Sequence, residues 1–182
     1  MNHIVIIGFM GSGKTRVGKR LAQDLELPFI DVDKVITKKM NLSVSEIYQR
    51  FGEPFYRAME TLIIKELLTD KERKVISLSA GLPAQEQNKK YLNQLGTIVY
   101  LKASYATIKK RLDAGSGKPI LDGDEKDDRD EKIRKLLAQR DPIYEGFADI
   151  VAVTGVKPFE GLIEEIREKL DASEKKVVEK RQ

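Results

Sequence analysis

One eight-residue segment constrains this chain more than any other, Gly8-Phe9-Met10-Gly11-Ser12-Gly13-Lys14-Thr15. It fits the phosphate-loop (P-loop) pattern Gly-x-x-x-x-Gly-Lys-Thr, and it follows an apolar run and precedes a helical pattern over 17–25. Glycines let such a loop turn with its amides pointing inward, and the amino terminus of the next helix adds partial positive charge. We therefore expect a strand, a phosphate-binding loop and a helix in succession, with ATP or GTP as the ligand.

The side chains of this loop have separate expected roles. Lys14 is expected to reach the β and γ phosphates, and the Thr15 hydroxyl to bind Mg²⁺. Because Lys14 neutralises phosphate charge, we also count it as catalytic. The predicted ATP-binding residues of the loop and the first helical turn are Gly11, Ser12, Gly13, Lys14, Thr15 and Arg16.

Five apolar runs have the length of buried strands, and they cover 4–7, 28–30, 75–78, 97–101 and 149–153. They lack polar alternation, which suits strands covered on both faces, and the segments between them leave room for helical crossovers. This pattern predicts an α/β, doubly wound domain with a five-stranded parallel sheet. A stripe at spacings of three and four predicts a closing helix and consists of Phe159, Leu162, Ile163, Ile166 and Leu170.

The length of 182 residues suits one domain, which we expect over 1–172. A segment over about 113–130, rich in glycine and charge, is predicted to be a mobile loop, either an insertion or a lid over a site. The chain has a net charge of +4, and its tail over 173–182 is basic, with four Lys or Arg and two Glu; we assign this tail no function. With no basic face readable from the sequence, we expect no nucleic-acid partner.

The composition also bears on the compartment. The chain has no cysteine, which excludes disulfides, thiolate catalysis and cysteine-bound metals and fits a reducing compartment. Its apolar runs are too short to span a bilayer, and no export signal precedes the first strand. We expect a cytoplasmic monomer that binds no membrane. The single histidine, His3, lies at the far end of the first strand and is expected to be structural or exposed.

An acidic pair, Asp31 and Asp33, directly follows the second apolar run. Ligands of parallel sheets bind outside the carboxyl ends of the strands, and in an extended chain residues i and i+2 point to the same side. We therefore expect both carboxylates to face the phosphate loop. One can hold Mg²⁺ through water while the other accepts the proton of an attacking hydroxyl.

At this point the chain resembles the shikimate kinase family over nearly its whole length. The phosphate loop and the aspartate pair match, as do Gly52-Glu53-Pro54-Phe55-Tyr56-Arg57 with Glu60, and Leu136-Leu137-Ala138-Gln139-Arg140-Asp141-Pro142-Ile143-Tyr144 with Ala148-Asp149. The resemblance implies that Arg57 and Arg140 bind the carboxylate of shikimate. Residue types alone leave that open, because two arginines suit a carboxylate or a phosphate equally well.

The resemblance also implies a P-loop kinase with a lid. By position Arg111 would stack on adenine, and Lys118-Pro119-Ile120-Leu121 would be the motif of the lid, which closes on ATP and excludes water. The implied reaction is the ATP-dependent phosphorylation of the 3-hydroxyl of shikimate, in aromatic amino-acid biosynthesis, with Mg²⁺ as cofactor. Asp33, Lys14 and Lys118 would be catalytic. Substrate would be held by Asp33, Arg57, Ala80, Gly81 and Arg140, and metal by Thr15 and Asp31.

Two other functions stay open from the sequence. The same machinery could phosphorylate a different small hydroxy acid or polyol, such as a gluconate-like acid. The chain could also be a nucleotide-binding module with weakened catalysis that acts through a partner, although Lys14, Thr15, Asp31 and Asp33 are all present.

Two positions depart from the family's pattern. Three glycines usually follow the third strand, whereas this chain has Ser79-Ala80-Gly81. If Ser79 or Ala80 required positive φ, strain of roughly 1 to 2 kcal/mol would weaken shikimate binding, and restoring the glycines would lower KM. Lys118 stands where the lid usually presents arginine. Since lysine lacks the guanidinium fork, we expect Lys118→Arg to raise turnover.

Overall fold

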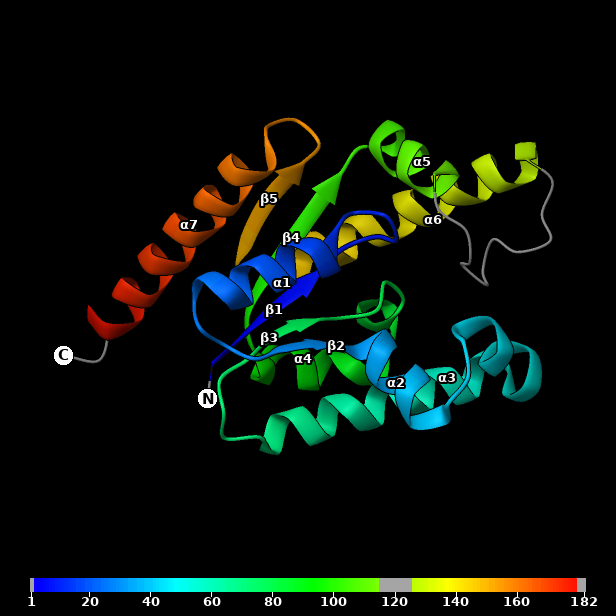
Figure 1. Ribbon diagram of the computed structural model, residues 1–182, viewed down its shortest axis with the longest axis horizontal. Helices are drawn as coiled ribbons and strands as arrows, with labels where there is room; N and C mark the ends of the chain where they lie inside the picture. The colour runs from blue at the N-terminus through cyan, green and yellow to red at the C-terminus, as the bar shows by residue number, and fades with distance from the viewer. Residues whose placement is uncertain (1, 115–125, 180–182) are drawn as a thin grey trace.

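A computed structural model describes residues 2–114 and 126–179, with the side chains of 126–127 and 174–179 left aside. Its centre is a five-stranded sheet in the order β2-β3-β1-β4-β5, and every pair is parallel (Figure 1). The strands are β1 (His3–Ile7), β2 (Phe29–Asp31), β3 (Val75–Ser77), β4 (Gly96–Ala103) and β5 (Ile150–Thr154). The predicted doubly wound parallel sheet is confirmed.

Helices cover both faces of this sheet. They are α1 (Lys14–Asp24), α2 (Val32–Met40), α3 (Val44–Thr69), α4 (Lys89–Leu95), α5 (Tyr105–Asp113), α6 (Lys126–Phe147) and α7 (Phe159–Glu179), with two short 3-10 turns, η1 (Leu82–Ala84) and η2 (Glu86–Asn88). Alternate residues of β1 show the two faces. Ile4 and Ile6 pack in a cluster with α1 and α7, whereas Val5 and Ile7 pack in a cluster with the other helices.

The carboxyl ends of the strands meet at one edge. Asp31 at the end of β2 is in register with Ser77 at the end of β3, and Ser77 is in register with Ile6 near the end of β1. The phosphate loop follows β1, so it starts beside the residues that follow β2 and β3. This register brings together segments that are far apart in the sequence.

Helix α3 carries several residues of the site, and a kink at Gly52 divides it into two helical segments. A capping box starts it, in which the Ser43 hydroxyl accepts from the Glu46 amide and the Glu46 carboxylate accepts from the Ser43 amide at 2.8 Å. At Gly52 the backbone leaves helical geometry, with φ 80° and ψ 167°, two residues before Pro54. The kink makes Pro54 an early residue of a new helical segment, a position that proline tolerates.

Some predicted boundaries are wrong. Residues 126–130 belong to α6 and not to the predicted loop, because a helix with mostly charged residues lacks the apolar stripe by which sequence reveals a helix. The rest of that loop, 115–125, lies outside the described residues. Helix α7 continues to Glu179, so part of the predicted tail is helical backbone. Among the described residues, no helix combines the length and apolar character needed to cross a membrane.

His3 is structural, as expected. Its side chain is buried, its Nε2 lies 3.1 Å from the Leu67 carbonyl oxygen, and its Nδ1 accepts from the Lys74 amide at 3.2 Å. It therefore ties the amino end of β1 to the end of α3 and the start of β3, far from the carboxyl edge of the sheet.

Candidate active site

The phosphate loop has the strand-loop-helix geometry that its motif predicts. Gly8 directly follows β1 with φ 150°, and a Cβ added there would lie 2.8 Å from both the Leu101 carbonyl oxygen and the Ser12 hydroxyl. Only glycine fits such a close approach. Helix α1 then begins at Lys14, so its free amides and partial positive charge point at the loop.

Lys14 and Thr15 both point back toward the loop and the strand ends. The Lys14 ammonium donates to the carbonyl oxygens of Gly8 and Phe9, at 2.9 and 3.0 Å. The Thr15 hydroxyl donates to Asp31 Oδ2 at 2.7 Å. An oxygen pair beside a phosphate loop suits Mg²⁺, which binds one or two protein oxygens and completes its shell with phosphate and water. Accordingly, no group of three or more potential acidic, histidine or cysteine ligands occurs within the described part of the chain.

The two aspartates of the acidic pair lie at the site, but they belong to different elements, which the sequence argument did not predict. Asp31 ends β2, and its Oδ1 accepts from the Lys34 amide at 3.3 Å, which caps α2. Asp33 lies in the first turn of α2 and not in extended chain. The i and i+2 argument is therefore wrong for Asp33, although both carboxylates do face the phosphate loop.

A cavity of about 340 Å³ joins these groups at the carboxyl edge of the sheet. Its walls come from the phosphate loop and α1, from the ends of β2 and β3, from the start of α2, from the segment after β3, and from α5. The lining residues are Met10, Gly11, Gly13, Lys14, Thr15, Arg16, Asp31, Asp33, Ser77, Ala80 and Arg111. One opening thus holds the predicted phosphate ligands together with the predicted base.

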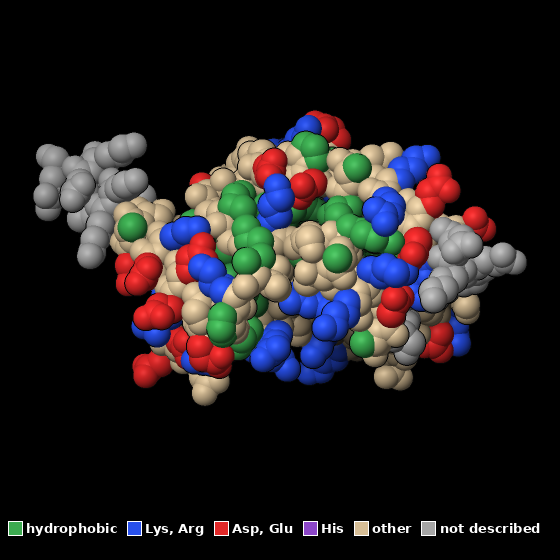
Figure 2. Space-filling model, turned by 90° about the horizontal axis from the view of Figure 1, so that it is seen from above, with side chains coloured by type: hydrophobic (Ala, Val, Ile, Leu, Met, Phe, Trp, Pro, Cys, Tyr) green, Lys and Arg blue, Asp and Glu red, His purple; other side chains and the backbone are tan. Residues whose placement is uncertain are grey.

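Two arginines border the nucleotide side of this cavity. Arg111 of α5 donates to the carbonyl oxygens of Gly11 and Ser12 at 3.0 and 2.9 Å, and to the Thr154 hydroxyl at 3.1 Å. It therefore ties α5 and β5 to the loop. Arg16 lies 4.0 Å over the ring of Phe159. Figure 2 views the molecule from the side of α5 and the β5–α7 connection, and Lys and Arg side chains gather near the middle of one long edge.

On the acceptor side, Arg57 of α3 lies between two carboxylates. Its Nη1 donates to both oxygens of Glu60, at 2.9 and 3.0 Å, and its Nε and Nη2 donate to Glu53 Oε1, at 3.0 and 2.7 Å. Glu60 is fully buried, whereas the Glu53 side chain is 51% exposed. Burial acts against the charge of Arg57, but Glu60 and the other partners outweigh it and raise its pKa.

The residues after β3 hold this network in place. The Ser79 hydroxyl donates to Glu60 Oε1. Burial raises the pKa of Glu60, and Arg57 and the Ser79 hydroxyl act against that rise. At Gly81 an added Cβ would lie 2.4 Å from Arg57 Nη1, so glycine is needed there for space and not for its φ of −84°.

The predicted strain at Ser79 and Ala80 is wrong. Among the described residues other than glycine, only Glu26 and Asn41 have positive φ. Ser79 and Ala80 therefore adopt backbone conformations open to any L residue. The substituted loop costs no backbone strain and adds a hydrogen bond to a buried acid.

Arg140 approaches the same place from α6. It is buried, and its guanidinium lies 5.9 Å over the ring of Phe9. Tyr144, one turn later, donates its hydroxyl to the Ala80 carbonyl oxygen at 2.6 Å. Burial raises the pKa of Tyr144 to about 12, and the charges of Arg140 and Arg57 oppose that rise, so both guanidiniums lie near one hydroxyl. No acid forms an ion pair with Arg140 within the described residues.

One residue of the site has no role in the sequence analysis. Tyr56 is buried on α3, and its hydroxyl donates to Asp33 Oδ1 at 2.5 Å. Tyr56 is part of the motif around Arg57, but a tyrosine at a buried helical position usually indicates core packing. By contrast, Lys118 lies outside the described residues, so its role in a lid stays a prediction.

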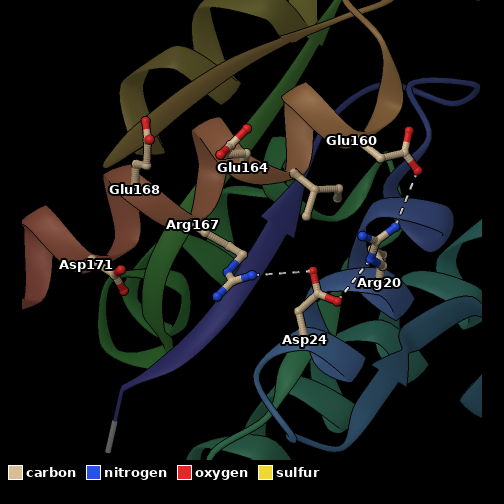
Figure 3. Close-up of a pocket in the computed structure, with 8 residues that line it drawn as sticks. Arg20, Asp24, Glu160, Glu164, Arg167, Glu168 and Asp171 are labelled. Atoms are coloured by element: carbon tan, nitrogen blue, oxygen red, sulfur yellow. Dashed lines mark hydrogen bonds and ion pairs between the residues drawn. The ribbon is translucent and has the colours of Figure 1, made fainter.

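A second hollow, of about 420 Å³, lies between α1 and α7 (Figure 3). Its walls carry opposite charges that pair with one another. Arg20 contacts Asp24 at 2.9 Å and Glu160 at 3.5 Å, and Arg167 lies 3.9 Å from Asp24. No residue of the phosphate loop reaches it. We interpret it as a surface groove crossed by ion pairs that join two helices.

Comparisons with known proteins agree with this geometry. The family model for shikimate kinase matches residues 10–171. The shikimate kinases of Thermodesulfovibrio yellowstonii and Moorella thermoacetica are 39% and 38% identical to this chain, each over 93% of it and over 93% and 95% of their own lengths. A solved shikimate kinase from Acinetobacter baumannii, in complex with shikimate, superposes with a TM-score of 0.84 at 30% identity, covering 95% of this chain and 94% of its own. This chain therefore belongs to the shikimate kinase family.

Proposed function

We propose that Asp33 accepts the proton of the 3-hydroxyl of shikimate while the γ-phosphoryl group of ATP is transferred to that oxygen. ATP-dependent phosphorylation of shikimate, a step of aromatic amino-acid biosynthesis, is the activity of the family to which the chain belongs. As the hydroxyl oxygen bonds to the γ phosphorus, the bond from that phosphorus to the bridging oxygen breaks. The products are shikimate 3-phosphate and ADP.

On the acceptor side, Arg140 and Arg57 are proposed to bind the shikimate carboxylate. Arg140 is the stronger candidate, because it is a buried cation with no acidic partner among the described residues, and buried charges are normally paired. Arg57 already contacts two carboxylates. Since Glu53 is half exposed, it can move aside and leave the Nε and Nη2 donors to the substrate, while buried Glu60 keeps the guanidinium in place. Ala80 lines the cavity with Asp33 and Gly81 lies against Arg57, so both are proposed to contact shikimate.

On the nucleotide side, Gly11, Ser12 and Gly13 are proposed to bind phosphate through their amides, with Lys14 on the β and γ phosphates. Arg16 and Arg111 flank the nucleotide, and Lys118 is proposed to come from the lid. Thr15 and Asp31 would hold Mg²⁺, which supplies charge neutralisation at the phosphate oxygens when bound. We further infer a cytoplasmic monomer, consistent with the absence of cysteine, and size-exclusion chromatography would test the monomer.

The observation that carries this proposal is that Asp33 and Lys14 line one cavity. The test is coupled ADP release with ATP and Mg²⁺, comparing shikimate, quinate, gluconate and no acceptor. We expect turnover with shikimate, and we expect Asp33→Asn to lower kcat at least about 100-fold. Asp24→Asn, on the far groove, serves as the matched control and should retain activity. Turnover with gluconate instead would support another acceptor, and ATP binding without any turnover would support a binding module.

A further inference from the structure

The contact between Tyr56 and Asp33 joins two helices across the acceptor side of the site. Tyr56 lies in α3, four residues after the kink at Gly52, and Asp33 lies in the first turn of α2. The phenol oxygen is 2.5 Å from Asp33 Oδ1, and Tyr56 is only 2% exposed. A short hydrogen bond from a buried donor to a carboxylate is of the strong, charge-assisted kind.

The tyrosine is held so that it can only donate. Its ring packs against Tyr48 with centroids 5.1 Å apart, which fixes the direction of the hydroxyl. Burial, followed by the charge of Asp33, raises the pKa of Tyr56 well above its ordinary value, so the phenol stays protonated. Other titratable and charged groups around the pair are Tyr48, Arg57 and Glu60 of α3, Asp31 of β2, Lys14 of α1 and Arg111 of α5.

A carboxylate has two oxygens, and this contact divides them. Oδ1 accepts from Tyr56, which leaves Oδ2 as the oxygen that can accept from a substrate hydroxyl. The contact therefore orients Asp33 before the acceptor arrives.

We propose that Tyr56 is a positioning residue that keeps Asp33 oriented for its reaction with the acceptor hydroxyl. The proposal rests on the proposed role of Asp33 as the base. A merely structural role, in which the phenol only needs a partner because it is buried, predicts a change in stability and no fall in kcat.

The first test is Tyr56→Phe, which removes the hydroxyl and keeps the ring. With saturating substrates, we expect kcat near neutral pH to fall about tenfold, since a hydrogen bond to a charged group is lost. The KM for shikimate should change much less than kcat, because Tyr56 contacts Asp33 and acts on the transfer step. The KM for ATP should not change.

Tyr100→Phe is the matched control. Tyr100 is also buried and donates its hydroxyl to an aspartate, Asp141 of α6. Loss of this hydroxyl should lower the melting temperature by a similar amount without lowering kcat.

If Tyr56→Phe folds poorly, 3-fluorotyrosine at position 56 keeps the test decisive, because it retains the ring and donates more strongly. We then expect kcat to stay near its original value, because the hydroxyl still donates to Asp33. A kcat that is unchanged in Tyr56→Phe, that falls as far in the fluorotyrosine variant, or that falls equally in Tyr100→Phe would overturn the inference while leaving Asp33 as the base. Full activity of Asp33→Asn would instead overturn the proposed function, and the inference with it.

Discussion

The two sides of the site are built by different means. On the nucleotide side, one contiguous loop presents backbone amides, and a glycine such as Gly8 is fixed by the 2.8 Å approach of its surroundings. On the acceptor side, side chains from α2, α3, α6 and the segment after β3 meet, and each orients the next. Ser79 contacts Glu60, Glu60 contacts Arg57, and Tyr56 contacts Asp33.

This difference predicts how each side responds to change. A phosphate loop acts on the γ-phosphoryl group of ATP, which is the same whichever acceptor is offered. Damage to the loop should therefore lower kcat with every acceptor. The network of Ser79, Glu60 and Arg57 acts on the position of shikimate, so damage there should raise KM for shikimate in proportion to how deeply the lost group is buried. The Tyr56–Asp33 contact is separate, because it acts on the proposed base and therefore on kcat. The following changes test that distinction, from the largest expected effect to the smallest.

Lys14→Ala should have the largest effect. It removes the cation that neutralises the transferring phosphate, and loss of a comparable group typically lowers kcat about 100- to 1,000-fold. The KM for shikimate should stay near its original value, because the proposed role of Lys14 is to neutralise the phosphates of ATP. Steady-state kinetics would measure both, with thermal unfolding to show that the loop still folds. A loss confined to the KM for shikimate would break the proposed division.

Glu60→Gln should have the next largest effect and should act on the other side. It removes the buried charge opposite Arg57, and breaking a buried pair costs roughly 3 to 5 kcal/mol of unfolding free energy. We expect KM for shikimate to rise about tenfold or more, because the guanidinium loses its fixed orientation. Urea unfolding and initial rates would measure these effects.

Glu53→Gln is the matched control for that change. It alters the other acid on the same arginine, but the Glu53 side chain is 51% exposed, so solvent screens its charge. We expect little change in stability. Equal losses of unfolding free energy in Glu60→Gln and Glu53→Gln would show that burial does not determine how much each contact contributes. That result would remove the basis of the comparison.

The sequence predicted the nucleotide side of the site better than the acceptor side. The five strands were predictable because buried parallel strands are continuous apolar runs, and the phosphate loop because its motif is contiguous. The start of α6 was not, since residues 126–130 are all charged. Arg57 and Arg140 came from the resemblance. The contact of Tyr56 with Asp33 depends on how α2 packs against α3, which no local pattern records.

Lys118→Arg tests the lid, which the sequence alone suggests. A guanidinium fork binds phosphate oxygens in a fixed geometry that an ammonium lacks, so we expect kcat to rise about fivefold. The KM for shikimate should not change, because the effect belongs to the nucleotide side. Lys118→Ala should lower kcat. A fall or no change in the arginine variant would count against a role of Lys118 in the transfer step.

Ser79→Gly should have the smallest effect, and its sign is the sharpest test of the acceptor network. From the sequence, restoring glycine would relieve strain and lower KM. In the structure Ser79 has no such strain, and its hydroxyl donates to buried Glu60. Loss of one such hydrogen bond corresponds to a rise in KM for shikimate of about threefold.

Two companion variants separate the hydroxyl from the backbone. Ser79→Ala removes the same hydrogen bond without adding backbone freedom, so it should raise KM as much as Ser79→Gly does. Ala80→Gly adds freedom and removes no hydrogen bond, so it should leave KM unchanged. If Ser79→Gly lowered KM while Ser79→Ala raised it, backbone freedom would outweigh the side-chain contact. The acceptor side would then depend on its backbone much as the phosphate loop does, and the contrast between the two sides would be one of degree.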